Sequence, residues 1–382
     1  MRIMVIGAGM MARAITFNLA QREEIDEICL VDREVKKAEQ IANWLSDKRV
    51  IPMRLDVTAP RAVREAMRGC VAAISAVPYF LNLSLAEAAV ASGTHFCDLG
   101  GNNRTVEKEF ALDEQAKQAR VTIIPDCGLA PGLVNILTAG AIAELTDVEV
   151  VKIRVGGLPQ CPHPPLDYQI VFSPHGLINE YMEQATIIRD GEAVKLSSLT
   201  EPEEISFPGY ECLEAFHTSG GTSTLPQTML GRVANLDYKT IRYPGHLEKI
   251  SAIAKLGFLD TTPRLVDEVE VSPRELAVRL LSENLSFDEP DVVLLRVTAN
   301  GSMDDQAVEV CYQIIDHFDE KTGLSAMMRT TGFPAAQVVF MLASGGIKEC
   351  GTLTQETYVP HEEFVAGLRR FGIGVERTVT RQ

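Results

Sequence analysis

Three short polar segments in the first third of the chain each follow an apolar run: residues 75–78, 98–101 and 126–128. They contain carboxyl, hydroxyl and thiol groups that can exchange protons or hold a polar ligand, beside glycines that allow tight turns. If the apolar runs are strands of one parallel sheet, the segments lie together beyond the carboxyl ends of the strands, where such sheets bind ligands. We therefore expect them to converge on one reaction centre.

Asp98 is the first candidate for the acid or base, or for the group that orients a substrate amine. Its alternative role is to cap the turn at Gly100 and Gly101, because aspartate side chains often bond to the backbone two residues on. Cys127, the second candidate catalytic residue, is expected to line the same pocket rather than to act as a nucleophile. His217, the third, could relay protons because imidazole titrates near neutral pH, or it could be a buried structural histidine.

The chain begins with an apolar run and the sequence GAGMMA, which has the spacing of a dinucleotide-binding turn between a strand and a helix. Gly7 allows the turn, Gly9 lets the backbone approach a pyrophosphate, and Ala12 keeps the helix close to the strand. The first amides of the helix then face the phosphates. Asp32 ends the second predicted strand, where a carboxylate can accept hydrogen bonds from an adenosine ribose.

Asp56 ends the third predicted strand and is expected beside the adenine. Asp32 would repel a 2′-phosphate and favours NAD over NADP, whereas the adjacent Arg33 could pair with such a phosphate or remain a solvated charge. The predicted cofactor is NAD, and NADP is the alternative. The residues predicted to bind it are Gly7, Gly9, Met10, Met11, Asp32, Arg33, Asp56, Val57, Ser75, Ala76, Val77 and Gly128.

Strand-like runs alternate with segments of helical periodicity through the first third of the chain. This alternation predicts βαβ units, and therefore an α/β fold with a doubly wound parallel sheet in a Rossmann domain over residues 1–130. Residues 131–332 have longer strand-like runs and fewer helices, which predicts a second, mixed α+β domain with one strand at 166–172. Residues 333–382 show helical periodicity again, and we expect this C-terminal helical segment to pack back on the Rossmann domain.

Composition narrows the class of protein. The 382 residues carry a formal net charge of −16 at pH 7, which argues against a nucleic-acid partner because phosphates need a basic face. No apolar run approaches the length of a membrane span. The eight cysteines are scattered without a CxxC pair, so we expect a cytoplasmic protein. Cys161 and His163 are too few ligands for a metal site, and no metal is expected.

Several segments together resemble the saccharopine dehydrogenase family, in particular its reductase branch and the related lysine 6-dehydrogenases. They are CDLGG, PDCGLAPGLVN, GGLP, the run from Tyr168 to Gly176, LEAFHTSGGTSTLP and KTIRYPGH. The resemblance implies a Rossmann domain, a second domain for substrate binding and oligomerisation, and hydride exchange at a carbon–nitrogen bond. It also implies an amino-acid substrate and a homodimer or higher homo-oligomer, and it points to Asp98 for the acid–base role.

One segment departs from the saccharopine reductases. They resemble this chain as far as Glu214 and then carry an Asn-Arg-Asp sequence that helps to hold a substrate with three carboxylates, whereas residues 216–222 here contain no arginine. Without that guanidinium, a smaller substrate with one carboxylate fits better. The segment resembles that of lysine 6-dehydrogenases, and so favours NAD-dependent oxidative deamination of the ε-amine of L-lysine to 2-aminoadipate 6-semialdehyde.

Two alternatives stay open: a saccharopine or carboxynorspermidine type of reductase or dehydrogenase that acts on a secondary amine, and a non-catalytic dinucleotide sensor. Arg242 is the candidate that holds the substrate α-carboxylate, and a core or interface ion pair is its alternative role. The other residues predicted to contact the substrate are Tyr168, His175, Thr218, Ser219 and Thr222.

Overall fold

The computed structural model describes residues 1–287 and 289–381, which divide into two compact units. Unit 1 contains Met1–Gly140, Ser223–Leu225 and Met328–Val375, and unit 2 contains the rest of the described chain. No helix within the described residues is long and apolar enough to cross a membrane.

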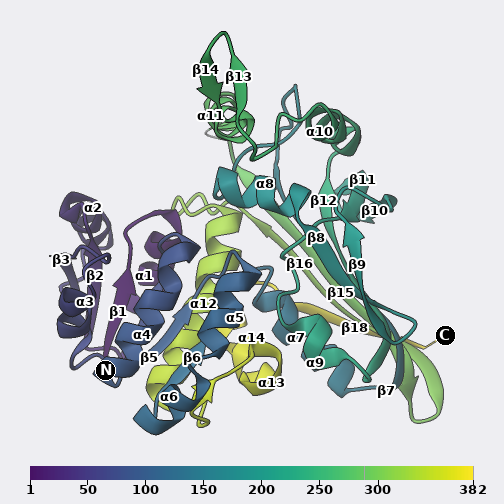
Figure 1. The fold of residues 1–382 in the computed structure, drawn as a ribbon. Coiled ribbons are helices and arrows are strands. Elements are labelled where there is room, and N and C mark those ends of the chain that lie inside the picture. Colours follow the sequence, from purple (N-terminus) through teal and green to yellow (C-terminus); the bar gives the residue numbers. More distant parts are fainter. Residues whose placement is uncertain (288, 382) are drawn as a thin grey trace. The chain divides into compact units, whose positions relative to one another are not determined.

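Unit 1 is built on a seven-stranded parallel sheet with the spatial order β17-β6-β5-β4-β1-β2-β3 (Figure 1). The strand order reverses between β1 and β4, which is the doubly wound arrangement predicted from the sequence and confirms it. The strands are β1 (Arg2–Ile6), β2 (Glu27–Asp32), β3 (Val50–Arg54), β4 (Ala72–Ser75), β5 (His95–Asp98), β6 (Thr122–Ile124) and β17 (Gly351–Thr352). The helices are α1 (Met10–Ala20), α2 (Val35–Leu45), α3 (Pro60–Met67), α4 (Asn82–Ser92), α5 (Asn103–Phe110), α6 (Asp113–Ala119), α7 (Leu133–Ala143), α12 (Ala326–Ser344), α13 (Gln355–Tyr358) and α14 (His361–Arg370).

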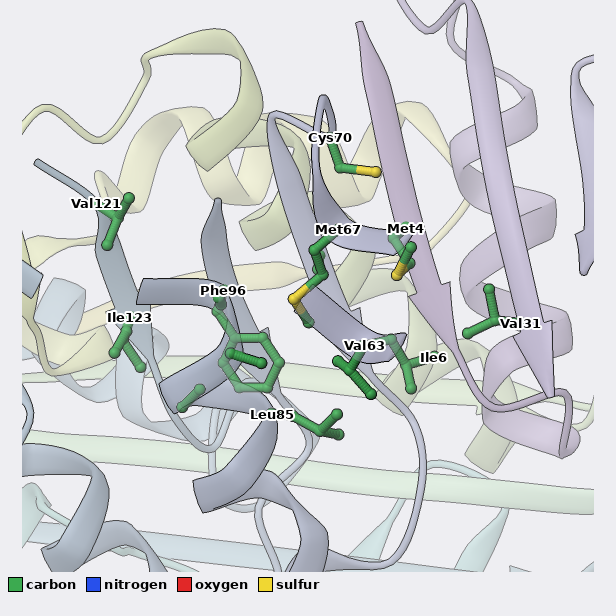
Figure 2. Close-up of a cluster of buried hydrophobic side chains, with 14 of the residues drawn as sticks. Met4, Ile6, Val31, Val63, Met67, Cys70, Leu85, Phe96, Val121 and Ile123 are labelled. Carbon is green, nitrogen blue, oxygen red and sulfur yellow. The ribbon is translucent and has the colours of Figure 1, made fainter. Parts of the chain in front are cut away.

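The central strands of the unit 1 sheet are buried on both faces, which explains why they read as continuous apolar runs. Residues 3–6 of β1 have no exposed surface. Figure 2 shows the core on one face, where the ring of Phe96 from β5 lies beside Leu85 from α4, among side chains of β1, α3 and β6. This packing anchors β5 at Phe96, which lies two residues before Asp98 in the same strand.

The segment predicted as a helical C-terminal tail contains α13, α14 and most of α12, but it also adds strands. Residues 351 and 352 extend the sheet of unit 1 by pairing with β6. Residues 328–375 belong to unit 1, but beyond α14 the strand β18 (Glu376–Arg381) pairs antiparallel with β16 in the sheet of unit 2, so the predicted C-terminal helical segment does not extend over residues 376–381. The sequence RTVTR is rich in β-branched residues, which favour a strand once an edge is present to pair with.

Unit 2 contains a nine-stranded mixed sheet, as predicted for an α+β domain. Its main path is β10-β11-β12-β7-β15-β16-β18, and β8 pairs with β12 and β9. Only the β7–β12 pairing is parallel among the described strands of this sheet. The strands are β7 (Thr146–Pro159), β8 (Gln184–Arg189), β9 (Glu192–Ser197), β10 (Glu203–Phe207), β11 (Tyr210–His217), β12 (Val233–Arg242), β15 (Asp291–Met303) and β16 (Gln306–His317).

The helices of unit 2 are α8 (Pro174–Met182), α9 (Leu225–Met229), α10 (His246–Lys255) and α11 (Pro273–Leu285), and a separate hairpin joins β13 (Arg264–Val266) to β14 (Val269–Val271). The strand predicted at 166–172 is absent, since this described segment consists of turns and irregular structure. Its alternating apolar residues instead pack into a core cluster that includes Leu166, Tyr168 and Phe216.

Replacing Phe96 with alanine removes a fully buried ring and is expected to lower the free energy of unfolding by about 3 to 5 kcal/mol. The matched control is Phe80→Ala, because that ring is 67% exposed and its loss should change the free energy by no more than about 0.5 kcal/mol. Urea denaturation followed by circular dichroism measures both. Equal effects of the two substitutions would contradict the packing role of Phe96.

Candidate active site

The turn between β1 and α1 is shaped to receive a pyrophosphate. Gly7 has a φ of +100°, and a side-chain carbon there would lie 2.9 Å from the Ala76 carbonyl oxygen. Gly9 is the N-cap of α1, and apart from its chain neighbours no described atom lies within 4 Å of where its side-chain carbon would stand. The amides of Met10 and Met11 begin the helix without a capping side chain. Open space before such amides fits the phosphates of a dinucleotide.

Asp32, the last residue of β2, braces this turn. Its Oδ2 accepts a hydrogen bond from the Ala8 N–H at 2.9 Å, and its Oδ1 accepts one from the Glu34 N–H at 2.8 Å. A carboxylate offers about four lone-pair sites, so each oxygen can accept a second hydrogen bond. Asp32 can therefore hold ribose hydroxyls while it supports the loop.

Asp56 follows β3, and its Oδ1 accepts hydrogen bonds from the Thr58 hydroxyl at 2.7 Å and the Thr58 N–H at 3.0 Å. These bonds lower the pKa of Asp56, and the nearby guanidinium groups of Arg33 and Arg54 lower it further. Two arginines, Arg33 and Arg54, thus lie near the carboxylates at this edge of the sheet. The sequence analysis singled out only Arg33. Val57, the next predicted cofactor contact, packs partly buried against the core.

The loop after β4 is tied to the glycine turn. Ala76 donates its N–H to the Ile6 carbonyl at 2.7 Å. The Ser75 hydroxyl is buried and donates to Asn82 Oδ1 at 2.7 Å, so its hydrogen is used within unit 1. Ala76 and Val77 are half-buried. The structure therefore brings the predicted segments at the ends of β1 and β4 together.

Asp98 ends β5 and is fully buried. Its Oδ1 accepts hydrogen bonds from the Gly100 N–H at 2.6 Å and the Asp126 N–H at 3.2 Å, which is the turn-bracing role that the sequence left open. Its Oδ2 is also buried and receives no hydrogen bond from an N–H or hydroxyl donor of the described residues. Turn bracing and proton transfer are compatible because they use different oxygens.

Two further carboxyl groups are buried beside Asp98. Glu109, on α5, lies within hydrogen-bonding reach of Asp98. Its two carboxyl oxygens accept no hydrogen bond from an N–H or hydroxyl group of the described residues. Asp126, after β6, accepts a hydrogen bond from the Ser223 hydroxyl and has a φ of +60°. A side-chain carbon at Gly100 would overlap Oδ1 of Asp126, so only glycine fits there.

Loss of water raises the pKa of all three carboxyl groups. For Glu109, burial is the main cause and the charge of Asp98 adds to it. For Asp98, burial outweighs the backbone hydrogen bonds that favour its ionised form. Burial, together with Asp98, raises the pKa of Asp126 to about 7. Neighbouring carboxyl groups that share a proton can donate at one oxygen and accept at another, which is what acid–base catalysis requires.

This cluster of carboxyl groups is not arranged as a metal site. In the described part of the chain, no group of three or more histidine, cysteine, aspartate or glutamate side chains could hold a metal ion.

Cys127 lies against the carboxyl cluster through its backbone. Its N–H donates to the Asp98 carbonyl at 2.7 Å, while its sulfur lies 3.3 Å from the Ile124 carbonyl oxygen. Burial raises the pKa of the Cys127 thiol well above its usual range, so the group stays protonated and is a poor nucleophile. Gly128 follows it and accepts a hydrogen bond from the Leu133 N–H at 2.9 Å.

In unit 2, two predicted substrate contacts meet. Arg242 ends β12, is buried, and stacks on the ring of Tyr168 at 4.6 Å from the ring centre. Its Nε donates to the Tyr181 hydroxyl at 3.2 Å and its Nη1 donates to the Ile241 carbonyl at 2.9 Å. Its Nη2 lies 4.0 Å from a carboxylate oxygen of Glu180, too far for a hydrogen bond.

The polar side chains at the end of β11 and just after it form hydrogen bonds within unit 2. His217 Nδ1 lies 3.0 Å from the Tyr238 carbonyl oxygen and Nε2 lies 3.3 Å from a Glu201 carboxylate oxygen, which matches the alternative of a structural histidine. The hydroxyls of Thr218 and Thr240 form a buried hydrogen bond of 2.6 Å. The relay and substrate roles of His217 and Thr218 therefore stay predictions.

The other predicted contacts are more dispersed within unit 2. Ser219 donates its hydroxyl to the Asn179 carbonyl at 3.1 Å, and Thr222 is buried. His175 lies exposed at the start of α8, with Nε2 at 3.9 Å from Glu275.

The sequence analysis did not single out four residues of these clusters: Glu109, Glu180, Tyr181 and His246, whose Nε2 lies 3.0 Å from the Tyr181 hydroxyl oxygen. A signal existed for Glu109, because it follows Val106 by three residues and so lies on the apolar face of α5. A carboxyl group at an apolar helical position is a candidate for function. No comparable spacing marks the other three, whose partners lie far away in the sequence.

Two family models cover most of the chain. Residues 3–124 match the saccharopine dehydrogenase NADP binding domain, and residues 128–373 match the saccharopine dehydrogenase C-terminal domain. The second match alone spans more than half of the chain.

The relatives are distant in sequence. Carboxyaminopropylagmatine dehydrogenase of Synechocystis sp. is 23% identical over 398 residues, which cover 97% of this chain and 96% of that protein. The mitochondrial alpha-aminoadipic semialdehyde synthase of Bos taurus is 23% identical over 75% of this chain, but the chain spans only 38% of that protein's length. The apo saccharopine dehydrogenase (L-Glu forming) of Saccharomyces cerevisiae shares the fold, with a TM-score of 0.82, 19% identity and 99% of both chains covered.

Replacing Glu109 with glutamine should flatten the pH dependence of stability. The raised pKa values mean that the folded state keeps protons that the unfolded state releases above about pH 4, so the free energy of unfolding falls as the pH rises, by about 1.4 kcal/mol per pH unit for each extra proton held. The substitution removes one such proton and the repulsion of Asp98. We expect a smaller loss of stability between pH 5 and pH 9 than in the wild type, measured by urea denaturation.

The control is Glu107→Gln, an exposed neighbour on the same helix, which should keep the wild-type slope. A wild-type slope in the Glu109 variant would show that this carboxyl group holds no extra proton in the folded state.

Proposed function

The chain belongs to the saccharopine dehydrogenase family of NAD(P)-dependent oxidoreductases, and we propose that it makes or oxidises the carbon–nitrogen bond of a secondary amine that carries an α-amino-acid group. The observation that carries the proposal is the buried carboxyl cluster of Asp98, Glu109 and Asp126 beyond β5 and β6, in a fold that fits a dinucleotide. The match to carboxyaminopropylagmatine dehydrogenase over nearly all of both chains supports it.

The chemistry requires proton transfer beside hydride transfer. A bound nicotinamide dinucleotide supplies the hydride acceptor, or the hydride donor in the reverse direction. The substrate amine is protonated in water and must lose a proton before its carbon can lose a hydride. Asp98 Oδ2 is suited to take that proton, and Glu109 is suited to share it. Water then splits the substrate imine into a carbonyl compound and a free amine, which again needs a base.

The second candidate function is the oxidative deamination of the ε-amine of L-lysine. The observation in its favour is that residues 216–222 contain no arginine, and that the hydroxyls of Thr218 and Ser219 bond within unit 2. This segment offers no guanidinium for the additional carboxylates of a larger substrate.

An amine panel separates the two functions. The purified protein is given NAD⁺ or NADP⁺ with saccharopine, a carboxyalkyl polyamine or L-lysine, and reduced dinucleotide and ammonia are both measured. The proposal expects reduced dinucleotide without ammonia from a secondary amine. Ammonia released from L-lysine would establish the second function instead, and binding of the dinucleotide without turnover of any amine would favour a sensor.

Replacing Asp98 with asparagine should reduce kcat with the preferred amine by about 100-fold or more, since general acid–base catalysis contributes about 10² to 10⁴. The asparagine keeps an oxygen that can accept the hydrogen bonds from Gly100 and Asp126, so the fold and the affinity for reduced dinucleotide should remain. Turnover at the wild-type rate would remove Asp98 from the mechanism.

We also propose that NAD is preferred over NADP, because the Asp32 carboxylate would repel a 2′-phosphate. Asp32→Asn removes the charge and should shift the ratio of the NADH and NADPH dissociation constants toward NADPH by about tenfold, or about 1.4 kcal/mol. Fluorescence titration measures both constants. If the wild type binds NADPH more tightly, Arg33 and Arg54 rather than Asp32 determine the preference.

A further inference from the structure

We propose that Ser223 is a positioning residue of the carboxyl cluster, which donates its hydroxyl hydrogen to Asp126 and so keeps that carboxyl group ionised beside Asp98 and Glu109. The negative charge of Asp126 then strengthens the base that the other two groups form. The inference rests on the proposed function for the reaction that this base serves, while the contacts that carry it lie within unit 1. Ser223 acts on the reaction through Asp126.

Residues 223–225 form a short segment of unit 1, and the chain before and after them belongs to unit 2. Two consecutive hydroxyl groups of this segment donate to carboxyl groups. Ser223 donates to Asp126 Oδ2, and Thr224 donates to Glu356 Oε1 at 2.8 Å. Hydrogen bonds from a hydroxyl to a carboxylate are stronger than those between neutral groups. The segment is therefore placed to stabilise negative charge.

Both partners of the hydrogen bond between Ser223 and Asp126 have a left-handed backbone. The angle φ is +46° at Ser223 and +60° at Asp126, a region that residues other than glycine seldom adopt. Asp126 is held further by Gln355, whose amide donates to its backbone carbonyl at 2.7 Å, and Gly100 leaves the space that Oδ1 occupies. Backbone conformations of this kind concentrate at functional sites, where the surrounding structure maintains them.

The carboxyl groups that act on Asp126 come from three elements: Asp98 from β5, Glu109 from α5 and Glu356 from α13. Burial, the charge of Asp98 and the charge of Glu356 raise the pKa of Asp126 to about 7. The hydrogen bond from Ser223 lowers that pKa, because a hydroxyl donor stabilises the ionised form. Near neutral pH, this one bond therefore decides how much of Asp126 is ionised.

The charge of Asp126 changes the strength of the neighbouring base. Burial and the charge of Asp98 are the larger causes of the raised pKa of Glu109, and the charge of Asp126 adds to them. Since Glu109 lies within hydrogen-bonding reach of Asp98, an ionised Asp126 strengthens the hold of this pair on protons. When the substrate amine is deprotonated, its N–H bond breaks, a carboxyl O–H bond forms, and the electron pair stays on nitrogen. A carboxyl pair that holds protons more firmly drives this step further.

The first measurement requires neither cofactor nor substrate. Carbon-13 NMR of protein labelled at the aspartate carboxyl carbons follows the ionisation of Asp126, and Asp126→Asn identifies its resonance. The midpoint in the wild type should lie at about pH 7. Ser223→Ala removes the donor and should raise the midpoint by about one pH unit or more. Ser223→Gly should raise it equally, and the fold should remain because glycine adopts a positive φ without strain.

The matched control is Ser92→Ala. It removes the hydroxyl of a half-buried serine of unit 1 that donates to the Ala88 carbonyl at 2.6 Å rather than to a carboxyl group. This variant should leave the midpoint of Asp126 at the wild-type pH.

The second measurement is the pH dependence of kcat/KM with the amine that the protein oxidises fastest. A serine with a merely structural role would lower the rate equally at every pH. We expect the acidic limb of the profile to move to higher pH by as much as the NMR midpoint. One pH unit below the wild-type midpoint, kcat/KM of Ser223→Ala should fall about tenfold, and at high pH it should return to the wild-type value.

A midpoint of Asp126 that stays unmoved in both Ser223 variants would overturn the proposal, and so would a moved midpoint with an unmoved rate profile. The proposed function fails by a different result. A moved midpoint in a protein that oxidises no amine would contradict the dehydrogenase and support the effect of Ser223 on Asp126. Turnover of an amine with an unmoved midpoint would contradict only the role of Ser223.

Discussion

The burial of three carboxyl groups beyond β5 and β6 is the constraint on which the organisation of unit 1 depends. In the described residues, Asp98, Glu109 and Asp126 form no ion pair with a basic side chain, so their charge is offset by backbone amides, a hydroxyl and shared protons. Gly100 leaves space for one of these groups, and Gln355 on α13 donates hydrogen bonds to the carbonyls of residues 125 and 126. The close packing favours the protonated forms of these carboxyl groups at the carboxyl ends of the strands, where such sheets generally bind ligands.

Unit 2 handles buried charge in two different ways. Arg154 is neutralised by two carboxylates, which is the expected solution for a structural position. Arg242 instead donates hydrogen bonds to the Tyr181 hydroxyl and a carbonyl and stacks on the Tyr168 ring, and the carboxylate of Glu180 lies 4.0 Å from its Nη2. The two buried arginines of unit 2 therefore differ in how their charges are compensated.

Family membership and substrate choice depend on different parts of the molecule. The yeast saccharopine dehydrogenase keeps the fold at 19% identity, because buried apolar strands tolerate exchange among similar residues. Substrate choice in enzymes depends instead on a few precisely placed polar side chains. In this chain the polar groups of residues 217–219 form hydrogen bonds to Tyr238, Thr240 and Asn179 within unit 2.

The sequence by itself determined the parallel sheet, the glycine turn and the loops at the carboxyl ends of its strands, because alternating periodicity and glycine spacing are local properties. It could not reveal that Glu109 faces Asp98, that Tyr181 and His246 orient Arg242, or that residues 376–381 join the second sheet. These contacts join residues that are distant in the chain, such as Tyr181 and His246, 65 positions apart. Only the tertiary structure decides these contacts, because the protonation state and the orientation of a polar side chain depend on its burial and on its hydrogen-bonding partners. The residues adjacent in the sequence determine neither its burial nor its partners.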